Sequence, residues 1–230
     1  MEQAAKASGV SALVEKTLVS TVLFVVSVSV FFAAGALTPK HVQVAWLATR
    51  WDASIPLVPP AVWFYLSWYL APWLVLAAPQ RDFRRIASAI LLAFIICAIG
   101  YVLLPVALGR PLVAGRTLSE RALRFLYDHD PPWNVFPSFH AAVCAVLWRP
   151  GFGRAFVRMV FPVWMSSICV ACVLTKQHNL LDVVAGLLVG LVALPAATAV
   201  LHSLDRGRLI VLRPASRESR LPMAGTAAER

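Results

Sequence analysis

Charged residues are scarce in this chain, and acidic residues are the scarcest. Only 14% of the 230 residues are charged, with 11 Asp and Glu against 21 Lys and Arg. Because a soluble domain carries about a quarter charged residues, this composition argues against a soluble protein. Hydrophobic residues make up 60% of the chain, in blocks of about twenty residues, which suffice to cross about 30 Å of hydrocarbon. The sequence predicts an all-α integral membrane protein.

Cysteines and metal-ligand clusters are equally few. Cys97, Cys144, Cys169 and Cys172 all lie in apolar blocks. The CxxC spacing of the last two has no basic neighbour to stabilise a thiolate, so we interpret these cysteines as packing residues. Outside the motifs described below, only the segment 128–130 (Asp-His-Asp) offers clustered metal ligands, and we interpret it as a solvated loop. We expect no metal and no cofactor.

Six apolar blocks predict six transmembrane helices. They are Leu18–Leu37, Ile55–Ala78, Ile86–Leu108, Val135–Trp148, Ala155–Leu174 and Asn179–His202. The first exceeds the 7–15-residue core of a signal peptide, so we expect an uncleaved span. The second is rich in aromatic residues, which indicates interfacial and bundle packing, with a slot for a lipid substrate as the alternative. In the sixth, Gly186 and Gly190 form a GxxxG pattern that predicts close helix packing.

The distribution of the basic residues predicts the orientation. The net charge of +10 falls in short stretches between apolar blocks, so we expect no nucleic acid partner. The N-terminal segment, the second and fourth connections and the C-terminal segment hold 14 of the 21 Lys and Arg residues. The positive-inside rule therefore places both termini in the cytoplasm. We expect one membrane domain over residues 1–204 and a disordered cytoplasmic tail over residues 205–230.

The third connection, residues 109–134, is the longest. Thr117 and Glu120 fit a capping box, and the apolar residues that follow recur at helical spacing. This pattern predicts an amphipathic helix lying at the outer membrane interface. Arg116, Arg121 and Arg124 in this connection are candidates for selecting the head group of a substrate.

Three polar clusters stand at the ends of predicted spans, all on the side opposite the cytoplasm. His178 and Asp182 are four residues apart on a helix and therefore share a face. A carboxylate near one imidazole nitrogen makes the other nitrogen a better nucleophile. His140, from another span, can supply the complementary acid. A nucleophile, an acid and an orienting carboxylate suit phosphoryl transfer.

The same clusters also offer an anion cradle. Arg110 and Lys176 provide positive charge, and Ser138 begins the fourth span as a cap or a direct ligand. Any one of these residues alone would be interpreted as structural, for example as an interfacial anchor or a helix cap. Their convergence on one side predicts a site that binds phosphate.

The segments Asn134-Val-Phe-Pro-Ser-Phe-His140 and Thr175-Lys-Gln-His-Asn-Leu-Leu-Asp182 resemble the second and third motifs of the type 2 phosphatidic acid phosphatase superfamily. That family contains membrane lipid phosphatases and lipid phosphotransferases such as the synthases of inositol phosphorylceramide and sphingomyelin. The resemblance implies that His178 forms a phosphohistidine and that Asp182 orients its ring. It implies that His140 is the acid and base, and that Ser138 and Arg110 bind phosphate.

Three positions depart from the family pattern. Leu103 stands where the first motif has a lysine, and Ala171 and Cys172 stand where the third motif usually has Ser-Arg. These departures resemble the branch of the family that contains the lipid phosphotransferases. Lys176 is a candidate replacement for one lost cation. An alcohol or second lipid therefore stays open as the acceptor.

We expect hydrolysis of a lipid phosphomonoester or diphosphate at the outer face of the membrane. The alternatives are a head-group phosphotransferase and a catalytically silent lipid-binding protein. The excess of arginine over lysine, together with abundant alanine, indicates a GC-rich bacterium and hence a plasma membrane. The expected partners are a phosphorylated lipid and the bilayer, and the sequence does not predict an oligomeric state.

Overall fold

The structure is a computed structural model that describes residues 2–37, 48–130, 132–148, 153 and 155–211. All its regular elements are helical in these ranges, as the sequence predicts. They are α1 (Glu2–Leu37), α2 (Arg50–Ser54), η2 (Pro59–Ala61), α3 (Val62–Ser67), η3 (Trp68–Leu70), α4 (Ala71–Leu74), η4 (Val75–Ala77), α5 (Gln80–Leu103), α6 (Leu118–His129), α7 (Phe139–Leu147), α8 (Ala155–Leu174) and α9 (Leu180–Val211).

Within the described residues, five helical segments are long and apolar enough to cross a membrane: Gly9–Leu37, Pro59–Ala77, Gln80–Leu103, Ala155–Leu174 and Leu180–Arg206. They coincide with the first, second, third, fifth and sixth predicted spans. The second is not one regular α-helix, because short α-helical and 3-10 segments alternate between η2 and η4.

The fourth predicted span differs from the prediction. Instead of a helix over Val135–Trp148, the structure has α7, a 9-residue helix. At 1.5 Å per residue it is about 14 Å long, less than half the hydrocarbon thickness. All residues from Ala141 to Leu147 are buried, so α7 is an inner helix surrounded by the longer ones. Its apolar composition reflects burial in protein, which apolar composition alone does not distinguish from burial in lipid.

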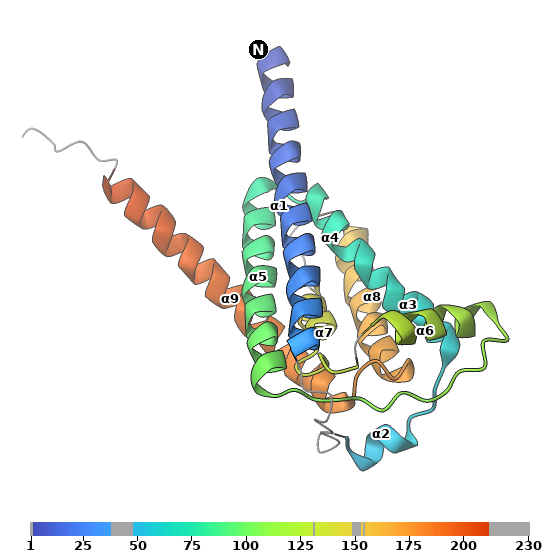
Figure 1. Cartoon of the computed structure of the whole chain (residues 1–230). Helices are drawn as coiled ribbons and strands as arrows, with labels where there is room; N and C mark the ends of the chain where they lie inside the picture. The colour runs from blue at the N-terminus through green and yellow to red at the C-terminus, as the bar shows by residue number, and fades with distance from the viewer. Residues whose placement is uncertain (1, 38–47, 131, 149–152, 154, 212–230) are drawn as a thin grey trace, which may run out of the picture.

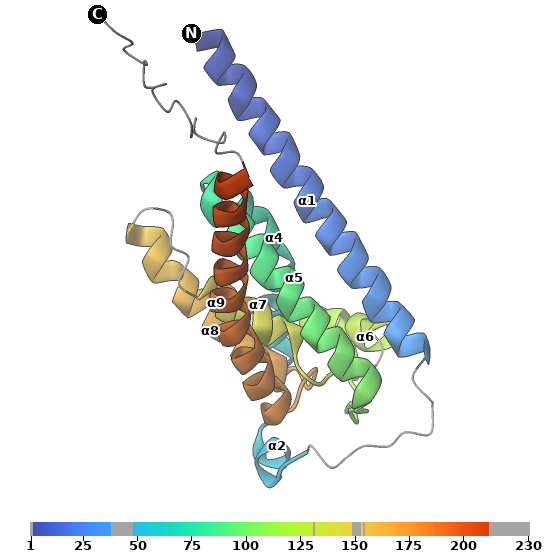
Figure 2. The ribbon, with the colours of Figure 1, turned by 90° about the vertical axis from the view of Figure 1, so that its left-hand side faces the viewer.

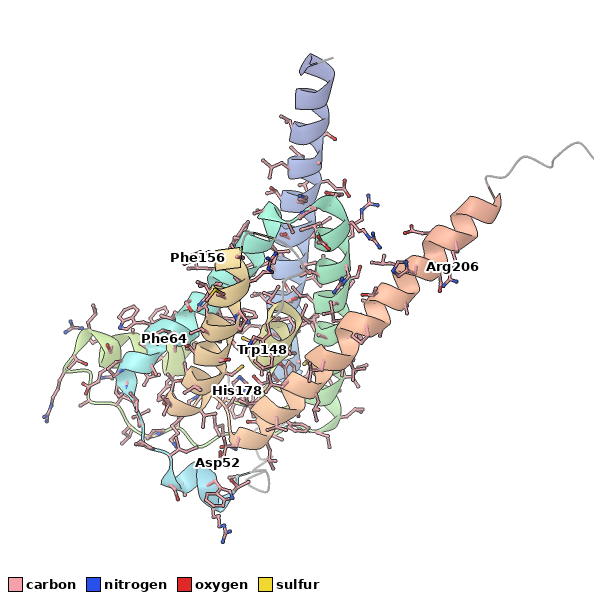
Figure 3. The ribbon with its side chains drawn as sticks, turned by 180° about the vertical axis from the view of Figure 1, so that it is seen from behind. Asp52, Phe64, Trp148, Phe156, His178 and Arg206 are labelled. Atoms are coloured by element: carbon pink, nitrogen blue, oxygen red, sulfur yellow. The ribbon has the colours of Figure 1, made fainter. Side chains whose placement is uncertain are left out.

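The long helices are arranged side by side and alternate in direction. In Figures 1 and 2, α1 and α5 run toward the end of the bundle that carries α2, and α9 runs away from it. The N-terminal end of α1 and the C-terminal end of α9 thus point to the same side. Figure 3 shows His178 and Asp52 near the opposite end, with Arg206 far from them. His178 therefore lies at the end of the bundle away from the N-terminal end of α1 and the C-terminal end of α9.

Two glycines of α9 allow α7 to pack directly against its backbone. A Cβ added to Gly186 would lie 2.1 Å from the carbonyl oxygen of Ser138, and one added to Gly190 would lie 2.2 Å from that of Ala142. Both distances are far below an ordinary contact, so only glycine fits. This agrees with the close packing predicted from the GxxxG pattern.

Two other predictions bear on the chain ends and connections. Thr117 and Glu120 form the predicted capping box at the start of α6, which lies across the bundle beside α3 in Figure 1. Helix α9 continues through Val211, past the predicted tail boundary at residue 204. The rest of the predicted tail, residues 212–230, lies outside the described residues.

Candidate functional site

The three residues with predicted catalytic roles come together from two helices and a turn. His140 lies in the first turn of α7, His178 in the turn between α8 and α9, and Asp182 in the first turn of α9. The ring centroids of the two histidines are 5.6 Å apart. Nδ1 of His178 is 3.9 Å from Oδ2 of Asp182. Both rings are thus close enough to contact a single phosphate group.

The ring of His178 is oriented by a backbone carbonyl. Its Nδ1 is 3.0 Å from the carbonyl oxygen of Val135, which can only accept a hydrogen bond, so Nδ1 carries the proton in the neutral ring. The lone pair then resides on Nε2. Burial lowers the pKa of His178 to about 4, the Val135 hydrogen bond opposes this shift, and the charge of Arg110 adds to it. At neutral pH the ring is uncharged and its Nε2 is available as a nucleophile.

Asp182 is buried beside this ring but makes its hydrogen bond elsewhere. Its Oδ2 accepts the backbone N–H of Asn179 at 2.7 Å, and this bond holds the first turn of α9. At 3.9 Å, Oδ2 of Asp182 is beyond hydrogen-bonding distance from Nδ1 of His178. The carbonyl oxygen of Val135 is thus the closer partner of Nδ1, and the orienting role of Asp182 stays a prediction.

His140 is held between two aromatic rings of the second span. The ring of Tyr65 stacks on it at a centroid distance of 4.6 Å, and that of Trp68 lies at 4.5 Å. Nε2 of His140 is buried and has no hydrogen-bond partner within the described residues. A fixed imidazole with an unpaired nitrogen is suited to exchange a proton with a bound ligand.

Both histidines line one cavity of about 330 Å³. Its polar wall also includes Arg110, Asn134 and Gln177, and much of the rest is aromatic or aliphatic. Helix α1 contributes apolar side chains such as Phe24 and Phe31. A cavity with an apolar wall at one side and convergent polar groups at the other is typical of a small-molecule site.

Arg110 lies in the polar wall, and its two terminal nitrogens make four hydrogen bonds, to Tyr127, Asp130 and Gln177. It donates to the carbonyl oxygen of Asp130 at 2.5 Å and to Oε1 of Gln177 at 2.6 Å, and it lies 3.5 Å from the Asp130 carboxylate. Its guanidinium also lies over the ring of Tyr127, 5.1 Å from the centroid. These contacts fix the guanidinium of Arg110 within the cavity wall. Burial raises the pKa of Asp130 to about 6, although the charge of Arg110 opposes that shift.

The other predicted phosphate-binding residues are placed differently. Ser138 is fully buried, and its hydroxyl accepts the Ala141 N–H as the N-cap of α7. Lys176 donates to the carbonyl oxygens of Asp52 and Ile55 at 2.8 and 2.6 Å. Neither residue is among those that line the cavity. The structure therefore places Ser138 as a cap and Lys176 as a tether to α2.

The three arginines predicted to select a head group are exposed on or beside α6. Arg124 pairs with Asp128 at 4.0 Å across one helical turn, and both side chains are more than half exposed. Arg116, Arg121 and Arg124 are not among the residues that line the cavity. Any contact that they make with a ligand would involve parts of it outside the cavity.

Sequence reasoning missed three polar residues of the site, Trp68, Asn134 and Gln177. Like His140 and Arg110, each of them lines the cavity and carries a buried polar atom that has no hydrogen-bond partner in the described part of the chain. Besides Nε2 of His140, these atoms are Trp68 Nε1, Arg110 Nε, Asn134 Oδ1 and Gln177 Nε2. Three of them are N–H donors. Gln177 and Asn134 stood inside the quoted motifs, and Trp68 in the aromatic-rich span, but their roles depend on distant segments.

A larger groove of about 670 Å³ lies elsewhere, between α3 and α8. It is lined mainly by apolar residues, among them Phe64, Trp148 and Pro162. Among the described residues, no titratable side chain lines this groove, whereas both histidines line the smaller cavity.

No protein-family model, curated protein or solved structure matches this chain. No group of three or more His, Cys, Asp or Glu side chains that could hold a metal ion occurs within the described residues. Function is therefore inferred from the motifs and from the geometry of the cavity.

Proposed function

We propose that this protein hydrolyses a lipid phosphomonoester or diphosphate without a metal ion, through a phosphohistidine at His178. The observation that carries the proposal is the pairing of His140 and His178, 5.6 Å apart in one cavity. The unpaired polar atoms that surround them are mostly N–H donors. A ligand rich in acceptor oxygens, such as a phosphate group, satisfies donors of this kind.

The reaction proceeds in two steps. In the first, His140 is protonated in the complex with the anionic phosphate. Nε2 of His178 attacks phosphorus, the bond from phosphorus to the lipid oxygen breaks, and the His140 imidazolium gives its proton to that oxygen. In the second, His140 takes a proton from water, the water oxygen bonds to phosphorus, and the phosphorus–nitrogen bond breaks. Inorganic phosphate leaves, and both imidazoles return to their starting states.

The surrounding donors stabilise the charge that gathers on the equatorial oxygens during both steps. Arg110 is held rigidly by Gln177 and Asp130, so its position does not change as charge develops. Preorganised donors of this kind supply much of the stabilisation in phosphoryl transfer. The unpaired N–H groups of Arg110, Gln177 and Trp68 line the same cavity as the two histidines and can supply these hydrogen bonds.

The apolar part of the cavity supports a lipid rather than a soluble substrate. Phe24, Ser27, Trp68 and Phe139 line both this cavity and a neighbouring narrow one that is otherwise lined mostly by apolar side chains. These shared residues place the second cavity next to the first, on the side of α1. A hydrocarbon chain bound against this apolar side would leave its phosphate beside His140 and His178.

The membrane arrangement belongs to the same proposal. The chain crosses the bilayer six times, and α7 lies within the fourth crossing. Both termini are cytoplasmic, following the distribution of Lys and Arg. The cavity then opens at the extracytoplasmic face of a bacterial plasma membrane, and α6 lies at that interface with Leu118 and Phe125 exposed toward lipid.

A lipid phosphotransferase is the second candidate. It uses the same phosphohistidine, with an alcohol in place of water. The observation in its favour is the absence of two motif cations. Leu103 stands where the first motif has a lysine, and Cys172, which is buried, stands where the third motif usually has an arginine. Fewer cations would hold a phosphoryl group less tightly and would tolerate a bulkier acceptor.

One assay separates the candidates. The purified protein is incubated with phosphorus-labelled phosphatidic acid, phosphatidylglycerol phosphate, a polyprenyl diphosphate and a phosphorylated sphingolipid precursor. Free labelled phosphate supports hydrolysis, and label in a new lipid supports transfer. His178→Ala removes either activity, whereas His202→Ala, an exposed histidine near the far end of α9, retains it. If none of these lipids loses its label, the result favours the catalytically silent lipid-binding protein over both enzymes.

A further inference from the structure

The turn that carries His178 is held by a helix from a distant part of the chain. Helix α2 lies between the first and second spans, more than a hundred residues away in sequence. Its Asp52 is buried, although four of its five residues are exposed. Figure 3 shows Asp52 close below His178 at one end of the bundle.

Asp52 is bound to both ends of this turn. Its Oδ1 accepts the backbone N–H of Leu180, the first residue of α9, at 2.8 Å. Its backbone carbonyl accepts Nζ of Lys176 at 2.8 Å. His178 lies midway between Lys176 and Leu180. One residue of α2 therefore holds the chain two residues before and two residues after the ring.

The backbone of Lys176 gives independent support. Its φ is +52°, and it is the only residue other than glycine with a positive φ in the described part of the chain. The turn ends α8 with the N–H groups of Gln177 and His178 directed at the carbonyl oxygen of Cys172. Glycine is the usual residue in this conformation, and a lysine there carries backbone strain. Its Nζ donates to the carbonyl oxygen of Asp52 in α2 and to that of Ile55, the residue that follows α2, and these two bonds offset the strain.

Asp52 is itself prepared for this contact. Burial raises its pKa, but hydrogen bonds from Thr49 and from the Leu180 N–H outweigh burial, so the net shift is downward. The side chain hydroxyl and the N–H of Thr49 both donate to Oδ2, at 2.6 and 2.7 Å. This capping box leaves Oδ1 directed at α9. The carboxylate is thus ionised at neutral pH and fixed.

We propose that Asp52 is a positioning residue that, together with Lys176, sets the place of the His178 ring for attack on phosphorus. The inference rests on the proposed function, because its catalytic readout requires phosphoryl transfer. Nothing in α2 lines the cavity, so Asp52 acts through the backbone on either side of His178. We call the contacts of Asp52 with Lys176 and Leu180 the clamp. Loss of the clamp lowers the rate of the chemical step and leaves substrate binding nearly unchanged.

The test compares Asp52→Asn with Ser54→Ala. In Asp52→Asn the amide group faces two donors from Thr49, so it cannot accept from Thr49 and Leu180 together. Ser54→Ala removes a hydroxyl from the exposed side of the same helix. We expect Asp52→Asn to lower kcat about tenfold, with KM within about twofold of the original. Ser54→Ala keeps both constants.

A second variant separates the clamp from backbone strain. Lys176→Gly adopts the positive φ without cost, so the turn still forms, but it lacks the two bonds made by Nζ. If the clamp positions His178, kcat falls in this variant as well. If Lys176→Gly matches the unmodified protein, the lysine bonds serve only to hold its own backbone and the proposal is overturned.

The ring of His178 is also observed directly, without turnover. In histidine-labelled protein, its ring resonances are assigned by their loss in His178→Gln. We expect them to move in Asp52→Asn and to stay in place in Ser54→Ala. Unmoved resonances overturn the proposal even if kcat falls. If the unmodified protein turns over none of the lipid phosphates, the proposed function fails, and these resonances still decide whether Asp52 positions the ring.

Discussion

Replacing Gly186 by alanine should cost activity far more than one methyl group would suggest. The added Cβ would lie 2.1 Å from the carbonyl oxygen of Ser138, whereas real Cβ contacts are almost never below 3.0 Å. The obstacle is backbone, so α7 must move away from α9 by about 1 Å. His140 lies two residues after Ser138 on α7, and His178 lies just before α9, so the movement separates the two rings.

A displacement of about 1 Å between reacting groups costs on the order of 100-fold in rate. We therefore expect Gly186→Ala to lower kcat/KM for the best lipid phosphate by about 100-fold. Gly190→Ala should act similarly, because its Cβ would lie 2.2 Å from the carbonyl oxygen of Ala142. Ala142 lies two residues beyond His140 on the same short helix.

The matched control is Gly9→Ala in α1, where an added Cβ meets nothing within 4 Å. Phosphate release is measured for all three variants in the same detergent, after size-exclusion chromatography and thermal melting confirm that each is folded. Gly9→Ala should keep the original kcat/KM. A folded Gly186→Ala variant with undiminished kcat/KM would refute the link between α7–α9 packing and the geometry of the histidine pair.

Three further predictions concern charge. Because only the neutral ring attacks and burial lowers the pKa of His178 to about 4, kcat/KM should fall on the acid side near pH 4, and a midpoint near 6.5 in a pH–rate profile would contradict the assigned nucleophile. Gln177→Glu should raise KM at least tenfold, whereas Gln177→Leu should have a smaller effect. The added carboxylate would sit 2.6 Å from Arg110 and repel phosphate, so equal KM values for the two variants would contradict this role. Alanine at Arg116, Arg121 and Arg124 together should change the relative rates on a lipid panel, and unaltered ratios would remove these arginines from head-group selection.

The fold could be predicted to the extent that composition and periodicity determine it. Apolar blocks of spanning length gave five of the helices, and Thr117 and Glu120 marked the start of α6. The fourth block was predicted as a span, whereas α7 has nine residues. An inner helix is apolar on all sides for the same reason as a helix in lipid, so length in the folded chain decides between them.

The candidate site shows the same division. The positions of His140, His178 and Asp182 at the ends of predicted spans on one side of the membrane predicted that they lie close together. In the structure each of them begins or precedes a helix. It did not predict that Lys176 would bind α2, since that depends on a helix more than a hundred residues earlier. The partner of His178 Nδ1 could not be predicted either. It is the backbone carbonyl of Val135, and every residue has such a group whatever its side chain.

The central claim is a covalent bond between phosphorus and His178, and one experiment addresses it directly. The protein is mixed with lipid labelled in its phosphate, with a chelator present, and quenched with base within milliseconds. Peptide mass spectrometry then locates the label. We expect an acid-labile, base-stable phosphate on His178, absent from His178→Ala and undiminished by the chelator. Hydrolysis that proceeds without label on this residue, or with the label on another residue, would contradict the mechanism.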